Sequence, residues 1–318
     1  MLQPATANPP ETARAATAVP EVTPAVKSKH PRYLVISPVR DEAEHLAKTI
    51  AALAAQTIPP SLWILVNDGS TDGTAELIDQ AANEHKWIRG VHRSNRGFRK
   101  SGTGVIEAFN EGLSLAADLE WDFLVKLDGD LSFSPAYFER CFASFAKDPN
   151  LGIGGGAISN NVNGTTVLEW AGDPPFHVRG ATKIYRRRCW EEIAGLIQAP
   201  GWDTLDEVKA NMLGWTTRTF GDIPIIHHRP AGAADGTWKN WVKNGLANYI
   251  AGYHPLFMAV KCVKRLFVKP FVLGSVGLGV GYASGYFKNV QQIKDPAVIR
   301  YLRREQLKRL CFRKSIWR

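Results

Sequence analysis

The stretch Phe123-Leu-Val-Lys-Leu-Asp128-Gly-Asp130 decides how this chain is interpreted. Its apolar run predicts a buried strand that ends in two aspartates on either side of one glycine. Side chains alternate along a strand, so Asp128 and Asp130 point the same way and repel each other unless a cation lies between them. Gly129 carries no side chain that would block a ligand. The pattern predicts a site for Mg²⁺ or Mn²⁺ carrying a diphosphate, and a solvated loop with two turn-forming acids is the alternative.

Apolar runs and helical patterns alternate on both sides of this stretch. Strands are expected at residues 33–39, 62–66, 88–92, 123–127 and 153–158, and helices at 42–55, 75–85, 105–119 and 134–145. This alternation predicts an α/β fold with a mostly parallel sheet and helices on both faces. Ligands of such sheets bind beyond the carboxyl ends of the strands. Asp41, Asp68 and Asp130 each follow a strand, so we expect one acidic site at that edge.

The pattern beyond residue 164 is mixed. We expect a strand at 183–185, helices at 187–194 and 206–213, and a hairpin-like pair of strands at 216–220 and 223–227.

The charge is divided unevenly along the chain. Residues 238–318 contain 16 Lys and Arg against 2 Asp and Glu, a net charge of +14. Because all 318 residues together carry +9, residues 1–237 carry −5. The basic rear predicts an anionic surface as partner, and without a nucleic-acid motif we expect a membrane rather than nucleic acid. The 4 cysteines show no paired spacing, which fits a reduced cytosolic setting.

The rear also has a membrane-like pattern. Residues 238–253 interleave aromatic side chains with lysines, as an interfacial helix does. Residues 271–287 carry no charge and are rich in glycine, which suits a short spanning helix, close helix packing or a re-entrant hairpin. The tail from residue 294 is basic and predicts attraction to anionic lipid; a solvated amphipathic helix is the alternative.

These patterns predict four segments and a location. Residues 1–30, rich in Ala, Pro and Thr, are expected to be a disordered leader without a secretory signal. The catalytic domain is expected at 31–235, the membrane-associated region at 236–290 and the basic tail at 291–318. We expect the protein at the cytoplasmic face of a membrane.

Three motifs occur in order: Ser37-Pro-Val-Arg-Asp-Glu42, Val66-Asn-Asp-Gly-Ser70 and Asp128-Gly-Asp130. This order resembles that of the family 2 glycosyltransferases, which have the GT-A fold, over roughly residues 33–229. The resemblance implies a metal-dependent, inverting transfer of a sugar from a nucleotide, expected to be UDP, to an acceptor in polysaccharide or glycolipid synthesis. Transfer onto a polyisoprenyl phosphate and a non-catalytic, sugar-nucleotide-binding membrane scaffold are the alternatives.

The resemblance implies roles for the loop residues. Asp68 would accept the imide N–H of a uracil, with Asp41 or Glu42 shaping the pocket. Asp130 would be the direct metal ligand, with Asp128 beside it. Arg96 and Lys100 would neutralise phosphates or remain solvated. The nucleotide-binding residues are expected to be Pro38, Arg40, Glu42, Asp68, Arg96, Lys100, Asp128 and Gly129.

A base for the acceptor hydroxyl is implied within Gly201-Trp-Asp-Thr-Leu-Asp-Glu207. Asp206 ranks first, ahead of Asp203 and Glu207, and capping of a helix is the alternative for each acid. His177, Arg179 and Trp202 are expected to contact the acceptor or the donor sugar, although a tryptophan is more often part of a core. The adjacent residues His227 and His228 point to opposite sides if extended, so at most one faces the site.

Overall fold

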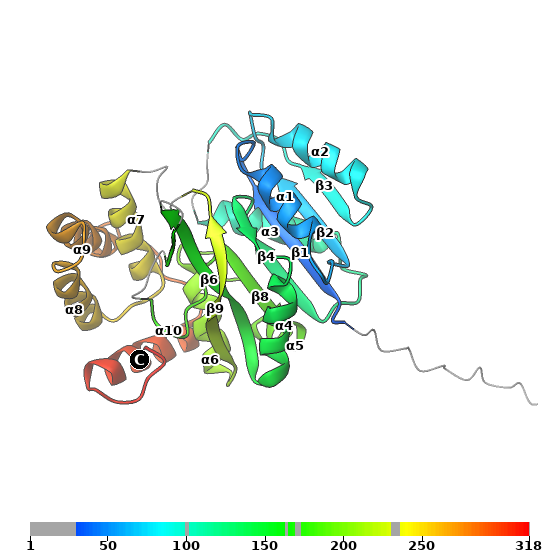
Figure 1. Cartoon of the computed structure of the whole chain (residues 1–318). Helices are drawn as coiled ribbons and strands as arrows, with labels where there is room; N and C mark the ends of the chain where they lie inside the picture. The colour runs from blue at the N-terminus through cyan, green and yellow to red at the C-terminus, as the bar shows by residue number, and fades with distance from the viewer. Residues whose placement is uncertain (1–29, 99–101, 163–164, 169–172, 230–235, 318) are drawn as a thin grey trace, which may run out of the picture.

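The computed structural model describes residues 30–98, 102–162, 165–168, 173–229 and 236–317 (Figure 1). The leader expected over residues 1–30 lies outside this part of the chain except for His30, and so does the expected phosphate contact Lys100.

The first half of the sheet follows the apolar runs of the sequence. Its strands are β1 (Tyr33–Val39), β2 (Leu62–Asn67), β3 (Ile88–His92) and β4 (Phe123–Leu127). They lie parallel in the order β3-β2-β1-β4, with Val35 of β1 opposite Trp63 on one side and Val125 on the other. All four predicted strands are confirmed, each to within one residue.

The second half of the sheet is mixed. Its strands are β5 (Leu131–Phe133), β6 (Leu151–Val162), β7 (Thr165–Leu168), β8 (Thr182–Arg186) and β9 (Thr216–His227). Strand β8 lies between β4 and β6 and is antiparallel to both, and β9 runs parallel to β6. Strand β5 pairs antiparallel with β9, and β7 pairs antiparallel with β6. The predicted parallel arrangement therefore holds for the first four strands and for the pair β6 and β9, and the other pairs are antiparallel.

Strand β9 corrects the predicted hairpin. The residues on both sides of Gly221-Asp222 form one strand of 12 residues beside β6. The register shifts there, because Phe220 is opposite Gly156 and Pro224 is opposite Ala157. The glycine and aspartate therefore lie in a bulge, and not in the turn that their residue types suggested.

Helices cover both faces of the sheet. They are α1 (Leu46–Ala54), α2 (Thr74–Glu84), α3 (Thr103–Ser114), α4 (Tyr137–Lys147), α5 (Arg187–Ile193) and α6 (Trp202–Met212). The alternation of side chains along β1 divides the core, because Val35 packs with α1, α2 and α4, whereas Leu34 and Ile36 pack with α3 and α5. Helix α6 begins at Trp202, four residues before the predicted start.

The described residues after β9 form four helices on one side of the sheet (Figure 1). They are α7 (Thr237–Ile250), α8 (Pro255–Arg265), α9 (Phe271–Phe287) and α10 (Pro296–Leu310). A third apolar core joins them to α6 through residues such as Leu205, Leu278 and Leu302. Helices α7 and α9 pack backbone to backbone, since a Cβ on Gly281 would lie 1.9 Å from the carbonyl oxygen of Val242.

The apolar run 271–287 forms α9, and its glycines serve close helix packing. Over the described ranges, no helix is both long enough and apolar enough to cross a bilayer. The aromatic side chains expected to anchor an interfacial helix mostly pack inward, since Trp241, Tyr249 and Tyr253 belong to or line the third core. The segment boundaries at residues 235 and 290 stay predictions.

Candidate active site

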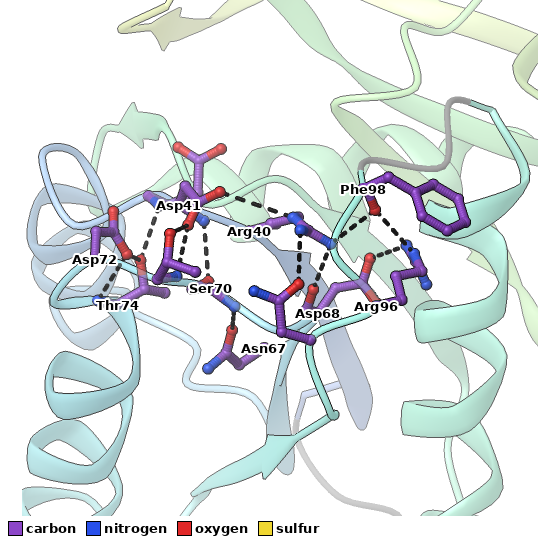
Figure 2. A network of polar contacts seen from close by, with 12 residues as sticks. Arg40, Asp41, Asn67, Asp68, Ser70, Asp72, Thr74, Arg96 and Phe98 are labelled. Atoms are coloured by element: carbon purple, nitrogen blue, oxygen red, sulfur yellow. Dashed lines mark hydrogen bonds and ion pairs between the residues drawn. The ribbon is translucent and has the colours of Figure 1, made fainter.

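The loops after β1 and β2 hold each other in place through hydrogen bonds from backbone amides to side-chain oxygens (Figure 2). The amide of Asp41 donates to Ser70 Oγ over 2.9 Å, and the amide of Thr71 donates back to Asp41 Oδ1 over 2.8 Å. The amide of Glu42 donates to Thr74 Oγ1 over 2.8 Å. The two motifs that the sequence singled out therefore form one rigid surface at the carboxyl edge of the sheet.

Asp68 is buried at the centre of this surface between two arginines. Arg93 Nη1 lies 2.5 Å from its Oδ1, and Arg96 pairs with its Oδ2. Arg40 donates to the backbone oxygens of Asp68 and Phe98, which ties the loop after β3 to the loop after β2 (Figure 2). Arg96, expected at a phosphate, binds a carboxylate here.

Arg93 was missed from the sequence. Its position directly after the end of β3, at the edge where Asp41 and Asp68 also follow strands, was the available signal. Pro38 lies within β1 opposite Val66 and is only partly buried.

The Asp128-Gly129-Asp130 motif follows β4 as predicted. Lys126 Nζ pairs with the Asp128 carboxylate and donates to the Gly180 oxygen over 2.6 Å. His227 Nε2 lies 3.3 Å from Asp130 Oδ2. A Cβ on Gly129 would lie 2.7 Å from Val39 Cγ1, so this position has to be glycine for packing against β1.

The two aspartates are electrostatically different. Burial alone would raise the pKa of Asp130, but the hydrogen bond and charge of His227, together with the charge of Arg229, bring that pKa below its usual value. Burial outweighs the nearby Lys126 at Asp128, so the pKa of Asp128 is raised. Asp130 is therefore the carboxylate that its surroundings keep ionised.

The acidic pair fits a divalent cation in one further respect. Asp130 Oδ1 is buried and has no hydrogen-bond partner, which leaves a hard oxygen for a cation. Within the described residues, no three His, Cys, Asp or Glu side chains are arranged to hold a metal by themselves. A cation here would need further oxygens, such as those of a diphosphate.

The acids of α6 lie in two environments. Asp206 and Glu207 are fully buried against Lys183, whose Nζ is 2.8 Å from Asp206 Oδ1 and 2.7 Å from Glu207 Oε1. Tyr185 donates to Asp206 over 2.6 Å, and the amide of Val178 donates to Glu207 over 2.7 Å. Burial, only partly opposed by Lys183, raises the pKa of Asp206 to about 7. Both acids serve an interior polar network, which argues against the first-ranked base.

Asp203 is the partly exposed member of the three acids. A Cβ on Gly180 would lie 3.2 Å from the Cβ of Asp203, and Gly180 in turn accepts the hydrogen bond from Lys126. Asp203 therefore lies on the side of α6 that faces the Asp128 loop.

Trp202 is buried between two lysines that occupy opposite positions on β4 and β8. Lys126 Nζ and Lys183 Nζ each lie 5.6 Å from the centre of its ring. His177 is bound to Glu207 with its Nδ1 3.0 Å from Oε2, and Arg179 lies 3.9 Å from Asp173. Trp202 is thus an interior side chain, whereas His177 and Arg179 are partly exposed.

The end of β9 brings two further groups to the site. His227 contacts Asp130, whereas His228 Nε2 lies 3.0 Å from Ser132 Oγ, so the two histidines diverge as expected. Arg229 Nη2 lies 2.7 Å from Glu42 Oε2, which joins the end of β9 to the loop after β1. Sequence reasoning did not assign Arg229 to the site.

A separate cavity of about 620 Å³ lies between α10 and the start of β9. Tyr301 and Arg218 are among the residues that line it. None of the predicted site residues does.

The sequence has relatives of known class. Residues 34–187 match the family described as Glycosyl transferase family 2. Identity is 30% over 146 residues to an undecaprenyl-phosphate mannosyltransferase of Micrococcus luteus, covering 44% of this chain and 57% of that protein. It is 30% over 148 residues to a polyprenol monophosphomannose synthase of Mycolicibacterium smegmatis, covering 46% and 52%. The chain thus spans just over half the length of these curated relatives.

Solved structures share the fold. The mannosyltransferase PcManGT from Pyrobaculum calidifontis, in complex with GDP-Man and Mn²⁺, aligns with a TM-score of 0.52 at 17% identity over 89% of this chain and 88% of that one. Residues 1–349 of S. aureus TarS, in complex with UDP-GlcNAc, align with a TM-score of 0.51 at 16% identity over 85% and 79%. Residues 34–187 form a family 2 glycosyltransferase domain with the GT-A fold.

Proposed function

We propose that this protein is a metal-dependent glycosyltransferase that moves a sugar from a nucleotide donor to an acceptor held at a membrane surface. The observation that carries the proposal is the convergence of acids from separate loops at one edge of the sheet. Arg229 joins the end of β9 to Glu42, His227 joins it to Asp130, and the Asp68 amide donates to Val39 of β1 over 2.8 Å.

The donor would lie across the loops after β1, β2 and β4. Asp68 would accept an N–H from the nucleobase, with Arg93 and Arg96 holding its carboxylate. Uracil and guanine both present such a donor next to a carbonyl group, so Asp68 alone does not select between UDP and GDP. The solved relatives carry one donor of each kind, GDP-Man and UDP-GlcNAc.

Asp130, with Asp128 beside it, would hold Mg²⁺ or Mn²⁺ together with the diphosphate. The metal would stabilise the negative charge that develops on the leaving nucleoside diphosphate. The protein's own part is to orient the two carboxylates, through Lys126 at Asp128 and His227 at Asp130.

Two acceptor classes suit the acceptor side of the site. A polyisoprenyl phosphate is favoured by the names of the two mannosyl-transferring relatives, and its phosphate needs no base. A glycan hydroxyl is favoured by Asp203, whose partly exposed side chain faces the Asp128 loop and could take the proton. The basic rear supports an anionic membrane surface at the cytoplasmic face in both cases.

The experiment supplies the full chain with UDP- and GDP-sugars, Mn²⁺, and either a polyisoprenyl phosphate or a neutral glycolipid. We expect one donor to release its nucleoside diphosphate when the right acceptor is present. With a hydroxyl acceptor, the rate of sugar transfer by Asp203→Asn should be about 100-fold lower than that of the unchanged protein. With a phosphate acceptor, the two rates should agree within about twofold. Nucleotide binding without turnover on any acceptor would favour the scaffold alternative and contradict the proposal.

A further inference from the structure

Helices α8 and α9 present an apolar face outward. On α8, Leu256, Val260 and Val263 are exposed, at the spacing of one helix face. On α9, Val272, Val276, Val280 and Phe287 repeat this pattern, whereas the opposite face of α9 packs on α7. We name this exposed set, together with Leu266, Phe267 and Val268 of the connection, the α8–α9 face.

The connection and the end of α9 carry the most exposed side chains of the α8–α9 face. Phe267 is 78% and Phe287 is 90% exposed. Isolated apolar side chains on a protein surface need no explanation, but a contiguous set on two neighbouring helices marks an interaction surface. Figure 1 shows both helices at the outer end of the molecule, with α7 between α9 and the sheet.

The segment that carries this face has charges of one sign. Residues 237–294 contain eight Lys and Arg and no Asp or Glu. Lys264, Lys269 and Lys288 are exposed within or beside the two helices. An apolar face with exposed lysines beside it complements an anionic lipid surface, where apolar side chains enter the acyl region and lysines reach the headgroups.

Self-association fits this charge pattern less well. A second copy would bring the same basic border against the first, and like charges repel. An acidic protein partner would pair with the lysines. Its charged surface would not account for the exposed apolar side chains of both helices and their connection.

The α8–α9 face connects to the site through packed backbone. Helix α9 packs on α7 at Gly281 and Gly245, where added Cβ atoms would lie 1.9 and 2.1 Å from carbonyl oxygens of the partner helix. Helix α7 packs on the start of α6, where a Cβ on Gly201 would lie 3.8 Å from the Ala247 oxygen. The residues that follow Gly201 are Trp202 and Asp203. A partner bound to α8 and α9 is therefore held at a fixed distance from Asp203 and the start of α6.

We infer that the α8–α9 face is a monotopic membrane-binding surface, which enters one leaflet of an anionic bilayer with both helices lying in its plane. The inference deepens the proposed function, because it fixes which surface carries the site to a lipid-borne acceptor. It replaces both the spanning helix and the re-entrant hairpin that the apolar run suggested.

The test is flotation of the full chain with vesicles of phosphatidylcholine, alone or with an equal amount of phosphatidylglycerol. We expect binding to the anionic vesicles that weakens with salt. The Val263→Glu/Val276→Glu variant, with one change on each helix, should bind at least about tenfold more weakly. The Lys264→Gln/Lys269→Gln/Lys288→Gln variant should lose the preference for anionic vesicles.

The matched control is Leu115→Glu/Leu119→Glu, which adds the same charge at exposed apolar positions of the glycosyltransferase domain. It should bind vesicles as the unchanged chain does. Mn²⁺-dependent binding of UDP or GDP, measured in parallel, should persist in every variant, so a failed donor site is distinguished from a failed membrane surface. The inference is overturned if the unchanged chain does not float with anionic vesicles, or if the two glutamates only disrupt a dimer.

Discussion

Lys183 Nζ and Asp206 Oδ1 lie 2.8 Å apart with both side chains fully buried, beneath the start of α6. Removing one partner of such a pair leaves a buried charge without compensation. We expect Asp206→Asn to lower the free energy of unfolding by about 3 kcal/mol, because Glu207 still neutralises part of the Lys183 charge. Urea unfolding of the full chain measures this change.

Asp203→Asn is the control for that experiment, since Asp203 is partly exposed in the same helix. It should change the free energy of unfolding by less than about 0.5 kcal/mol. Equal losses from both variants would mean that the buried network does not stabilise α6.

Two glycines of α9 make a second matched pair. A Cβ on Gly281 would meet the Val242 backbone, whereas the nearest atom to one on Gly279 is Cys262 Sγ at 3.8 Å. Backbone atoms cannot move aside as a side chain can, so Gly281→Ala should destabilise the protein by about 2 kcal/mol or more. Gly279→Ala should stabilise it by about 0.5 to 1 kcal/mol through helix propensity. Equal melting temperatures for the two variants would contradict the α7–α9 packing.

His177 gives the stability a pH dependence. Burial lowers the pKa of His177, but the neighbouring Glu207 carboxylate outweighs burial, so the pKa lies above the ordinary 6.5. The charged pair therefore stabilises the fold fully below pH 6.5, and this contribution is lost as the pH rises through the raised pKa. The melting temperature should fall as the pH rises from 6.5 through the raised pKa of His177, and it should fall less in the His177→Gln variant. Parallel curves for the two proteins would exclude this pair as the cause.

The sequence predicted the parts of the fold that depend on local pattern. Strands β1, β2 and β4 are predominantly apolar, and the loops after them are rich in turn residues, so these strands and loops were identified. The start of α6 was misplaced because the acid pair at residue 206 was taken for a helix beginning. The true N-cap is Gly201, which has a φ of +86° and directly precedes Trp202.

Partners that are distant in the chain could not be predicted in this way. Lys126 and Lys183 are charged residues inside strands, and only the register of β4 with β8 brings them to the same tryptophan. The contact between His227 and Asp130 depends on how β9 pairs with β5. No local periodicity encodes these pairings, so the ion pairs around the site follow from the fold alone.

The central claim is that Asp130 binds a divalent cation together with a nucleoside diphosphate. Calorimetric titration of the full chain with UDP and with GDP, each with and without Mn²⁺, tests it most directly. We expect one nucleotide to bind only when Mn²⁺ is present, and Asp130→Asn to weaken that binding at least about tenfold while the variant without ligand still unfolds cooperatively. Equal affinity of Asp130→Asn and the unchanged protein for the nucleotide with Mn²⁺ would contradict the claim.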